Sequence, residues 1–278
     1  MEPTENRLLD EARSEPVKNA FRLGWEFVDQ NRMLALVTLG IFVLLSLLEV
    51  VPFIGLIAAV ALGVFGQAIQ IYVGRSFYEA ASIERFVEGA AATTLKEFLT
   101  RYQAPAFGAW LGWFVIGMAM LILWMVLVGM TGFDPAVFEG GMQDEAQAFE
   151  FLKAMGAATL PLILIALVLM YVYPIVQGRI ILSDTFGDAF KAVFSFFSPA
   201  VWAHAMKGEY FSFVLVFGLA LIGFSFVVGI VLALLMLIPA LGLIVGFVAV
   251  MLLMYVLMIV LGVANVLGRE IAEGGKPV

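Results

Sequence analysis

Residues 52–75 read PFIGLIAAVALGVFGQAIQIYVGR, an apolar run that starts at a proline and closes on a Gly-Arg dipeptide. A helix of about 20 apolar residues is long enough to cross a bilayer, and proline suits its first turn. Two further apolar runs close on the same dipeptide, at Gly178-Arg179 and at Gly268-Arg269. The run therefore predicts a transmembrane helix, and its recurrence predicts one membrane unit that is used three times.

The composition of the whole chain indicates that lipid is its solvent. Of the 278 residues, 63% are hydrophobic and 13% are charged, whereas a soluble domain holds about 45–50% apolar and about 25% charged residues. The net charge of −7 argues against a nucleic-acid partner, and the absence of cysteine excludes disulfides and thiolate metal sites. We expect a membrane protein with no cofactor.

Six apolar runs reach or approach spanning length. They cover residues 33–51, 52–73, 107–130, 158–177, 211–238 and 239–267. The first two runs nearly touch, as do the last two, and these joints carry Pro52 and Pro239, since proline cannot continue a helix interior. The sequence thus predicts an all-α polytopic membrane protein in which six transmembrane helices form three hairpins.

Lysine and arginine indicate which side of the membrane each loop faces. With six spans, one side holds 14 of the 15 basic residues and the other side holds only Lys153. Cytoplasmic loops carry the excess of lysine and arginine, so both termini are expected in the cytoplasm. The basic residues on that side are Arg7, Arg13, Lys18, Arg22, Arg32, Arg75, Arg85, Lys96, Arg101, Arg179, Lys191, Lys207, Arg269 and Lys276.

Internal repeats support the threefold plan. An amphipathic stripe before the first span recurs, offset by 169, before the fifth span. The joint at residues 51–57 resembles the joint at 238–244, and a middle stripe matches at five of six positions but fails at Thr94. We predict a single membrane domain, 1–278, with pseudo-repeats at about 14–79, 80–184 and 185–273.

The stripes have the spacing of one helix face, so each hairpin is expected to follow an amphipathic helix. Aromatic residues on one face with a basic residue beside it suit a helix that lies in the headgroup layer. An elbow packed under the bundle is the other interpretation, and the two are compatible. The stripe residues are Val17, Ala20, Phe21, Gly24, Trp25 and Val28; Ile83, Phe86, Val87, Ala90 and Ala91; and Phe186, Ala189, Phe190, Val193, Phe194 and Phe197.

Small residues predict where helices approach closely, because they allow backbones to come together. Pairs spaced four apart are Gly108 with Gly112, Gly242 with Gly246, and Ala59 with Gly63, and Gly218, Gly223 and Gly229 suggest the same in the fifth span.

Ionisable side chains inside spans mark transporters and intramembrane enzymes, and the interiors of these runs hold none. Gln67 and Gln70 are three apart and share one helix face. They either line a polar path, bind a headgroup, or form hydrogen bonds between helices. Arg75, Arg179 and Arg269 either contact lipid phosphates or serve as anchors at the cytoplasmic ends of the spans.

No catalytic set can be assembled from the sequence. His204 is the single histidine, no nucleophile–base pair is visible, and no glycine-rich phosphate loop precedes a helix. The acidic outer loop at 131–157 either binds a cation or is a solvated polar loop, and it lacks the ligand pattern of a calcium site. We therefore expect no catalytic residue, no metal site and no enzyme activity.

A Pro-x-x-Gly joint combined with repeated amphipathic helices resembles a family of uncharacterised six-span bacterial inner-membrane proteins. These look distantly similar to the membrane domain of glycerophosphodiester phosphodiesterase. The resemblance implies the six-span fold and a location in the bacterial cytoplasmic membrane. It does not imply the phosphodiesterase activity, because no acidic metal ligands of that barrel are present. The residues that carry it are AFRLGWEF at 20–27, PFIG at 52–55, AFK at 189–191 and PALG at 239–242.

Two functions remain open. The first is a non-enzymatic integral membrane protein that organises lipid or supports other membrane proteins, a second copy included, within a complex. The second is a transporter or channel for a small or apolar solute, with Gln67 and Gln70 on its path. An intramembrane enzyme is the least favoured class.

Overall fold

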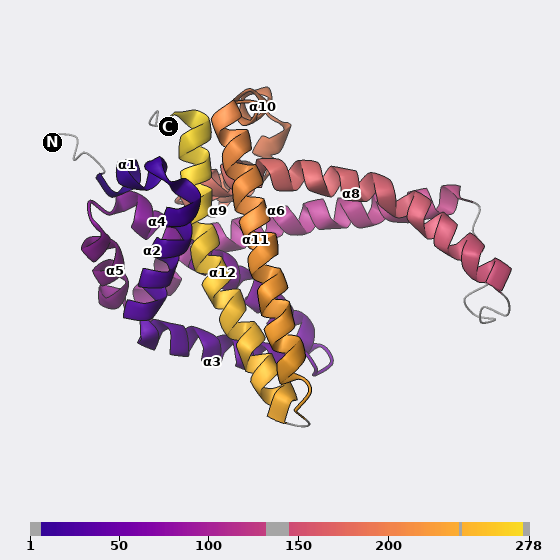
Figure 1. Ribbon diagram of the computed structural model, residues 1–278, viewed down its shortest axis with the longest axis horizontal. Coiled ribbons are helices and arrows are strands. Elements are labelled where there is room, and N and C mark those ends of the chain that lie inside the picture. The colour runs from indigo at the N-terminus through magenta and orange to yellow at the C-terminus, as the bar shows by residue number, and fades with distance from the viewer. Residues whose placement is uncertain (1–6, 132–144, 239–240, 275–278) are drawn as a thin grey trace.

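The computed structural model describes residues 7–131, 145–238 and 241–274 (Figure 1). Nearly all of these residues are helical and no strand occurs among them, which confirms the all-α class. The elements in chain order are α1 (Arg7–Ser14), α2 (Pro16–Gln30), α3 (Arg32–Leu48), α4 (Ile54–Glu79), α5 (Ile83–Ala92), α6 (Leu95–Met130), α8 (Glu145–Ile181), α9 (Phe186–Val193), η1 (Phe194–Phe197), α10 (Pro199–Ala205), α11 (Gly208–Leu235) and α12 (Leu241–Glu273).

Five of the described helices, α4, α6, α8, α11 and α12, are long and apolar enough to cross a membrane by themselves. The first expected span, 33–51, is shorter than predicted, because α3 has 17 residues and ends at Leu48. Pro52 follows and Phe53 has a φ of 63°, so the chain turns here. A sixth span arises only if α3 is counted with α2, from which it is bent by 90°.

The helices pack together at one end of the molecule and separate at the other. The hub consists of α1, α2, α5, α9 and the parts of the long helices at 66–80, 98–112, 172–181 and 259–273, and it holds most of the buried core. Two arms leave the hub in different directions (Figure 1): the α6–α8 arm at 113–130 and 151–168, and the α11–α12 arm at 218–235 and 244–252. The most apolar stretches of α6 and α11 are only 6% buried.

The amphipathic helix α2 is an elbow packed on α12. A Cβ added to Gly24 would come within 2.7 Å of Val260 Cγ2, so the two helices touch at backbone distance. Trp25, expected on the packed stripe, is instead 63% exposed, because the buried face is centred on Leu23 and Phe27. The contacts are those of the elbow interpretation, and a place in the headgroup layer stays a prediction.

The amphipathic helix α9 crosses α6 at the expected pair of small residues. A Cβ at Gly112 would lie 2.7 Å from Val193 Cγ2, and a Cβ at Gly108 would collide with the carbonyl oxygen of Phe186. The prediction that Gly108 and Gly112 mark a close helix contact is confirmed, and the partner is the third amphipathic helix.

Thr94 interrupts the middle stripe because it begins the next helix. Its hydroxyl accepts from the backbone N–H of Glu97 (3.3 Å), and the Glu97 carboxylate accepts from the backbone N–H of Thr94 (2.9 Å). This reciprocal pair is a capping box. Helix α6 therefore begins at Leu95, well before the span predicted from residue 107.

The two hairpin joints expected to correspond share one backbone geometry. Gly55 N–H donates to the carbonyl of Val51 (2.7 Å), and Gly242 N–H donates to the carbonyl of Ile238 (2.8 Å). At both joints a Cβ would collide with a carbonyl oxygen near the end of the preceding helix, so glycine is required. Pro239 itself lies outside the described residues.

Candidate functional site

The glycines of the three Gly-Arg dipeptides lie at helix crossings inside the hub. A Cβ on Gly74 of α4 would come 2.9 Å from the carbonyl oxygen of Gly262 on α12, and a Cβ on Gly178 of α8 would come 2.7 Å from the carbonyl oxygen of Asn265. A Cβ on Gly268 of α12 would come 2.7 Å from Pro174 of α8 and 2.9 Å from Phe213 of α11. The long helices α4, α8 and α12 thus meet where only glycine fits.

The dipeptides do not end their helices, contrary to the sequence-based expectation. Helix α4 continues to Glu79, α8 to Ile181 and α12 to Glu273. Among the described glycines only Gly274 has a positive φ, 73°, and it directly follows α12 as a left-handed helix cap. The glycine of each dipeptide therefore serves close packing, and helical backbone runs through it.

Arg75 is enclosed by the end of α8, and its side chain is only 6% exposed. Its Nε donates to the carbonyl of Ile181 (3.2 Å), one Nη to the carbonyl of Ser183 (2.7 Å), and the other to the carboxylate of Asp184 (2.7 Å). Carbonyl groups at a helix C-terminus carry partial negative charge. The arginine of the first dipeptide, on α4, therefore caps the C-terminal end of α8.

Arg179 and Arg269 meet at one carboxylate, that of Glu273. Arg179 donates to Glu273 Oε1 from Nε (2.8 Å), and Arg269 Nε lies 2.9 Å from Glu273 Oε2, with its N–H poorly aligned for a hydrogen bond. Arg269 also donates to Glu270 (2.7 Å), whose other oxygen accepts from Arg13. A chain of ion pairs thus joins α1, α8 and α12.

These contacts define what the three arginines do within the chain. Their side chains are 6%, 28% and 1% exposed for Arg75, Arg179 and Arg269, and all three guanidinium groups are paired with protein carboxylates. Such charge-assisted pairs fix orientation, and removing one partner leaves a buried charge uncompensated. Contact with a lipid phosphate stays a prediction, and Arg179 has the most accessible side chain of the three.

Gln67 and Gln70 of α4 meet Gln177 of α8. The Gln177 amide nitrogen donates to the side-chain oxygen of Gln67 (2.8 Å) and of Gln70 (3.4 Å). Gln177 is fully buried, yet its Oε1 has no partner among the described residues, and neither has Asn265 Nδ2 on α12. Buried polar atoms without protein partners are common places for water or a polar solute. The glutamines therefore join two helices and leave hydrogen-bonding capacity unused.

The side chains gathered here take part in charge pairing and hydrogen bonding. Within the described ranges, no three His, Asp or Glu side chains come together as a metal site. Glu270 and Glu273 are each engaged by two arginines, so neither is placed as a general base. Of the acidic outer loop expected at 131–157, residues 132–144 lie outside the described residues, and residues 145–157 form the start of α8.

Sequence reasoning missed Glu270, Arg13 and the direct pairing of the glutamines with Gln177. Glu270 follows the third Gly-Arg dipeptide immediately, and an acid beside a buried arginine is a usable signal for an ion pair. No local signal pairs Arg13 with Glu270, because 257 positions separate them.

Comparison of the chain with protein-family models, with curated proteins and with solved structures finds no match.

Proposed function

We propose that this chain is a non-enzymatic integral membrane protein of the bacterial cytoplasmic membrane that organises lipid or supports partner proteins in a complex. In this proposal its helices form three hairpins and six spans, with α2–α3 supplying the first, and the hub faces the cytoplasm with both termini. The excess of basic residues on the hub side supports that orientation. The resemblance of its joints and stripes to six-span inner-membrane proteins supports the location.

The exposure of the arms carries the proposal. The most apolar stretches of α6 and α11 are 6% buried, although the hub ends of the same chain are closely packed. Gly117 on α6 and Gly218, Gly223 and Gly229 on α11 have no atom within 4 Å of the place where a Cβ would stand. Small residues in membrane helices allow another helix to approach, so these faces suit lipid or a partner helix.

The α11 face offers a direct test. Gly218, Ser225 and Gly229 share one face of the helix, whereas Gly223 lies on another. The double substitution Gly218→Leu with Gly229→Leu is expected to abolish recovery of a bound protein or a second copy from mild detergent or nanodiscs. The thermal unfolding temperature should stay unchanged or rise, since no neighbouring atom lies within 4 Å of either added Cβ and leucine favours helix over glycine.

Gly223→Leu is the matched control, because it adds the same side chain to a different face of the same helix. It should leave recovery of the partner unchanged. Isolation of the wild-type chain as a monomer with neither bound protein nor ordered lipid would overturn the proposal.

A transporter or channel for a small or apolar solute is the second candidate. The observation that favours it is the cluster of Gln67, Gln70 and Gln177 in a buried crossing of three helices, where Gln177 Oε1 and Asn265 Nδ2 have no hydrogen-bond partner in the described part of the chain. Polar groups inside a helical membrane protein mark solute paths when they are not fully used in packing.

Flux through reconstituted liposomes tests this candidate. Gln67→Leu combined with Gln70→Leu is expected to abolish solute flux while the protein still folds. Gln103→Leu on the exposed surface of α6 is the control. Wild-type flux in the double variant would exclude a path along these glutamines.

A further inference from the structure

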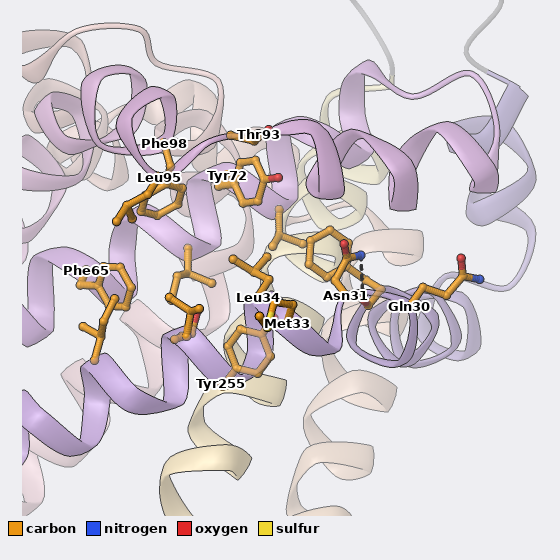
Figure 2. Close-up of a pocket in the computed structure, with 16 residues that line it drawn as sticks. Gln30, Asn31, Met33, Leu34, Phe65, Tyr72, Thr93, Leu95, Phe98 and Tyr255 are labelled. Carbon is orange, nitrogen blue, oxygen red and sulfur yellow. Dashed lines mark hydrogen bonds between the residues drawn. The ribbon is translucent and has the colours of Figure 1, made fainter.

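A cavity of about 340 Å³ lies beneath the elbow between α2 and α3, closed by α4, the start of α6 and α12 (Figure 2). Its size is within the range of about 300–1,000 Å³ that is usual for small-molecule sites. None of the residues that line it is charged. The cavity is separate from the ion pairs and glutamines described above, and it suits a neutral, mainly apolar ligand.

The bend at Asn31 creates this space. The Asn31 side chain donates to the carbonyl of Phe27 (3.0 Å) and to the carbonyl of Val87 on α5 (3.3 Å), which fixes the elbow. Helix α3 then leaves α2 at 90°. The cavity is therefore a product of a held backbone bend, so it does not depend on one side-chain rotamer.

The cavity is polar at one end and apolar at the other. Figure 2 shows the buried Asn31 at one end, with the exposed Gln30 beyond it and directed away from the cavity, and Phe65 at the opposite end. At the rim, Met33 is 74% exposed and Leu95 is 57% exposed. An apolar rim admits a ligand from lipid more readily than from water, and a polarity gradient matches a molecule with one polar and one apolar end.

Two phenols on the cavity wall have unused hydrogen-bonding capacity. Tyr72 on α4 is 3% exposed and Tyr255 on α12 is 1% exposed, and both line the cavity. The Tyr255 hydroxyl has no hydrogen-bond partner among the described residues. The Tyr72 hydroxyl interacts with Thr93, which also lines the cavity, but the two do not meet in full hydrogen-bond geometry. Because buried polar groups are nearly always hydrogen-bonded, these phenols on one cavity, Tyr255 above all, indicate a ligand that carries an acceptor oxygen.

We propose that this cavity binds a neutral carbonyl-bearing lipid, with the carbonyl oxygen accepting from Tyr72 or Tyr255 and the apolar chain directed toward Phe65. An ester-linked acyl chain of a membrane glycerolipid has this chemistry, and so does an isoprenoid quinone. The inference rests on the proposed role in lipid organisation for its membrane setting, and it names the ligand class of that role.

An ester-linked and an ether-linked phospholipid with the same chains and headgroup differ only in the carbonyl group. Comparing how well the protein retains the two lipids therefore tests the proposed hydrogen bond to that carbonyl. Native mass spectrometry of the full-length protein should show the wild type retaining the ester lipid about fivefold better than the ether lipid, as one hydrogen bond provides. Tyr72→Phe combined with Tyr255→Phe should remove that preference while both lipids still bind. Tyr171→Phe is the control, because the Tyr171 hydroxyl donates to the backbone carbonyl of Ala205, away from the cavity. This variant should keep the preference for the ester lipid.

Leu34→Trp, which fills the cavity, should release both lipids, and the thermal unfolding temperature of each variant reports whether it is folded. Equal retention of ester and ether lipids by the wild type would overturn the proposal, as would a preference that survives in the double phenylalanine variant. Added quinone assigns the source: displacement of the ester lipid identifies quinone, and no displacement identifies glycerolipid. Neither result depends on partner recovery through the Gly218 and Gly229 face, so the two proposals can fail separately.

Discussion

In the hub, a Cβ added to Gly74, Gly112 or Gly178 would come 2.8, 2.7 or 2.6 Å from an atom of a neighbouring helix, whereas in the arms nothing lies within 4 Å of Gly117 or Gly223. The same residue type thus has two uses in one chain. In the hub, glycine lets helices cross at backbone distance. In the arms, no described residue packs against the face of the helix that carries the glycine, so that face is open to lipid or to a partner helix.

Polar side chains follow the same division. In the hub, Arg75 and Arg269 are buried in ion pairs, and the carboxylates that Arg269 contacts also pair with Arg13 of α1 and Arg179 of α8. In the α6–α8 arm, Trp124 donates to Thr159 across 3.3 Å. The hub is therefore held by charge, hydrogen bonds and close packing together, whereas the arms have fewer contacts within the chain and depend more on the lipid or protein around them.

The largest expected effect comes from Arg269→Met. Arg269 is 1% exposed and lies beside Glu270 and Glu273, so its removal leaves buried carboxylates with fewer cations. Breaking a buried ion pair from one side costs about 3–5 kcal/mol. The free energy of unfolding, measured by denaturant titration in detergent, should fall by that amount.

Arg32→Met is the control for Arg269→Met. Its side chain is 78% exposed and pairs with Asp29 three positions earlier, and exposed pairs contribute little to stability. If both arginine substitutions lowered stability equally, the network around Glu273 would have no special role in holding the hub.

The next largest effect comes from replacing glycine by alanine, which should lower stability in the hub but not in the arm. Gly178→Ala places a Cβ 2.6 Å from Arg269 Cβ, and such overpacking costs about 1–3 kcal/mol. Gly223→Ala meets nothing within 4 Å, and alanine favours helix over glycine by about 1 kcal/mol. Thermal unfolding in nanodiscs should show a lower midpoint for the first variant and an unchanged or higher midpoint for the second. A lower midpoint for both would mean that the α11 face is already packed.

Local patterns in the sequence were enough to predict the helical class, the apolar helices and the close contact at Gly108 and Gly112. They failed at the dipeptides, because a glycine that serves a helix crossing looks the same in sequence as a glycine that ends a helix. They also failed at the end of the first expected span, 33–51, because α3 stops at Leu48 and the chain turns near Phe53. The 90° bend at Asn31 is held by a hydrogen bond to the carbonyl of Val87 on another helix, which no local pattern reports.

The candidate site could be predicted only in part, because local patterns do not report contacts between distant segments. Periodicity placed Gln67 and Gln70 on one face of a helix, and the structure brings both to Gln177. Periodicity identifies a face but not the helix that covers it, since the partner depends on how segments more than 100 positions apart align. Arg75 belongs to the first dipeptide and Asp184 follows the second by five positions, but their pairing depends on the fold, because 109 positions separate them.

The smallest expected effect distinguishes packing from function at the glutamines. Gln177→Met keeps the side-chain volume but removes two donated hydrogen bonds, and a hydrogen bond between membrane helices contributes only about 0.6–2 kcal/mol. The substitution also removes the Oε1 atom that has no partner, which offsets part of the loss, so the net change should be about 1 kcal/mol or less. Trp124→Phe in the arm, which removes one hydrogen bond, should cost a similar amount in the same denaturant titration.

If the glutamines only join helices, the two variants will behave alike in every assay. Loss of solute flux in Gln177→Met, with stability equal to that of Trp124→Phe, would instead show that the unused hydrogen-bonding capacity of the hub serves a passing solute.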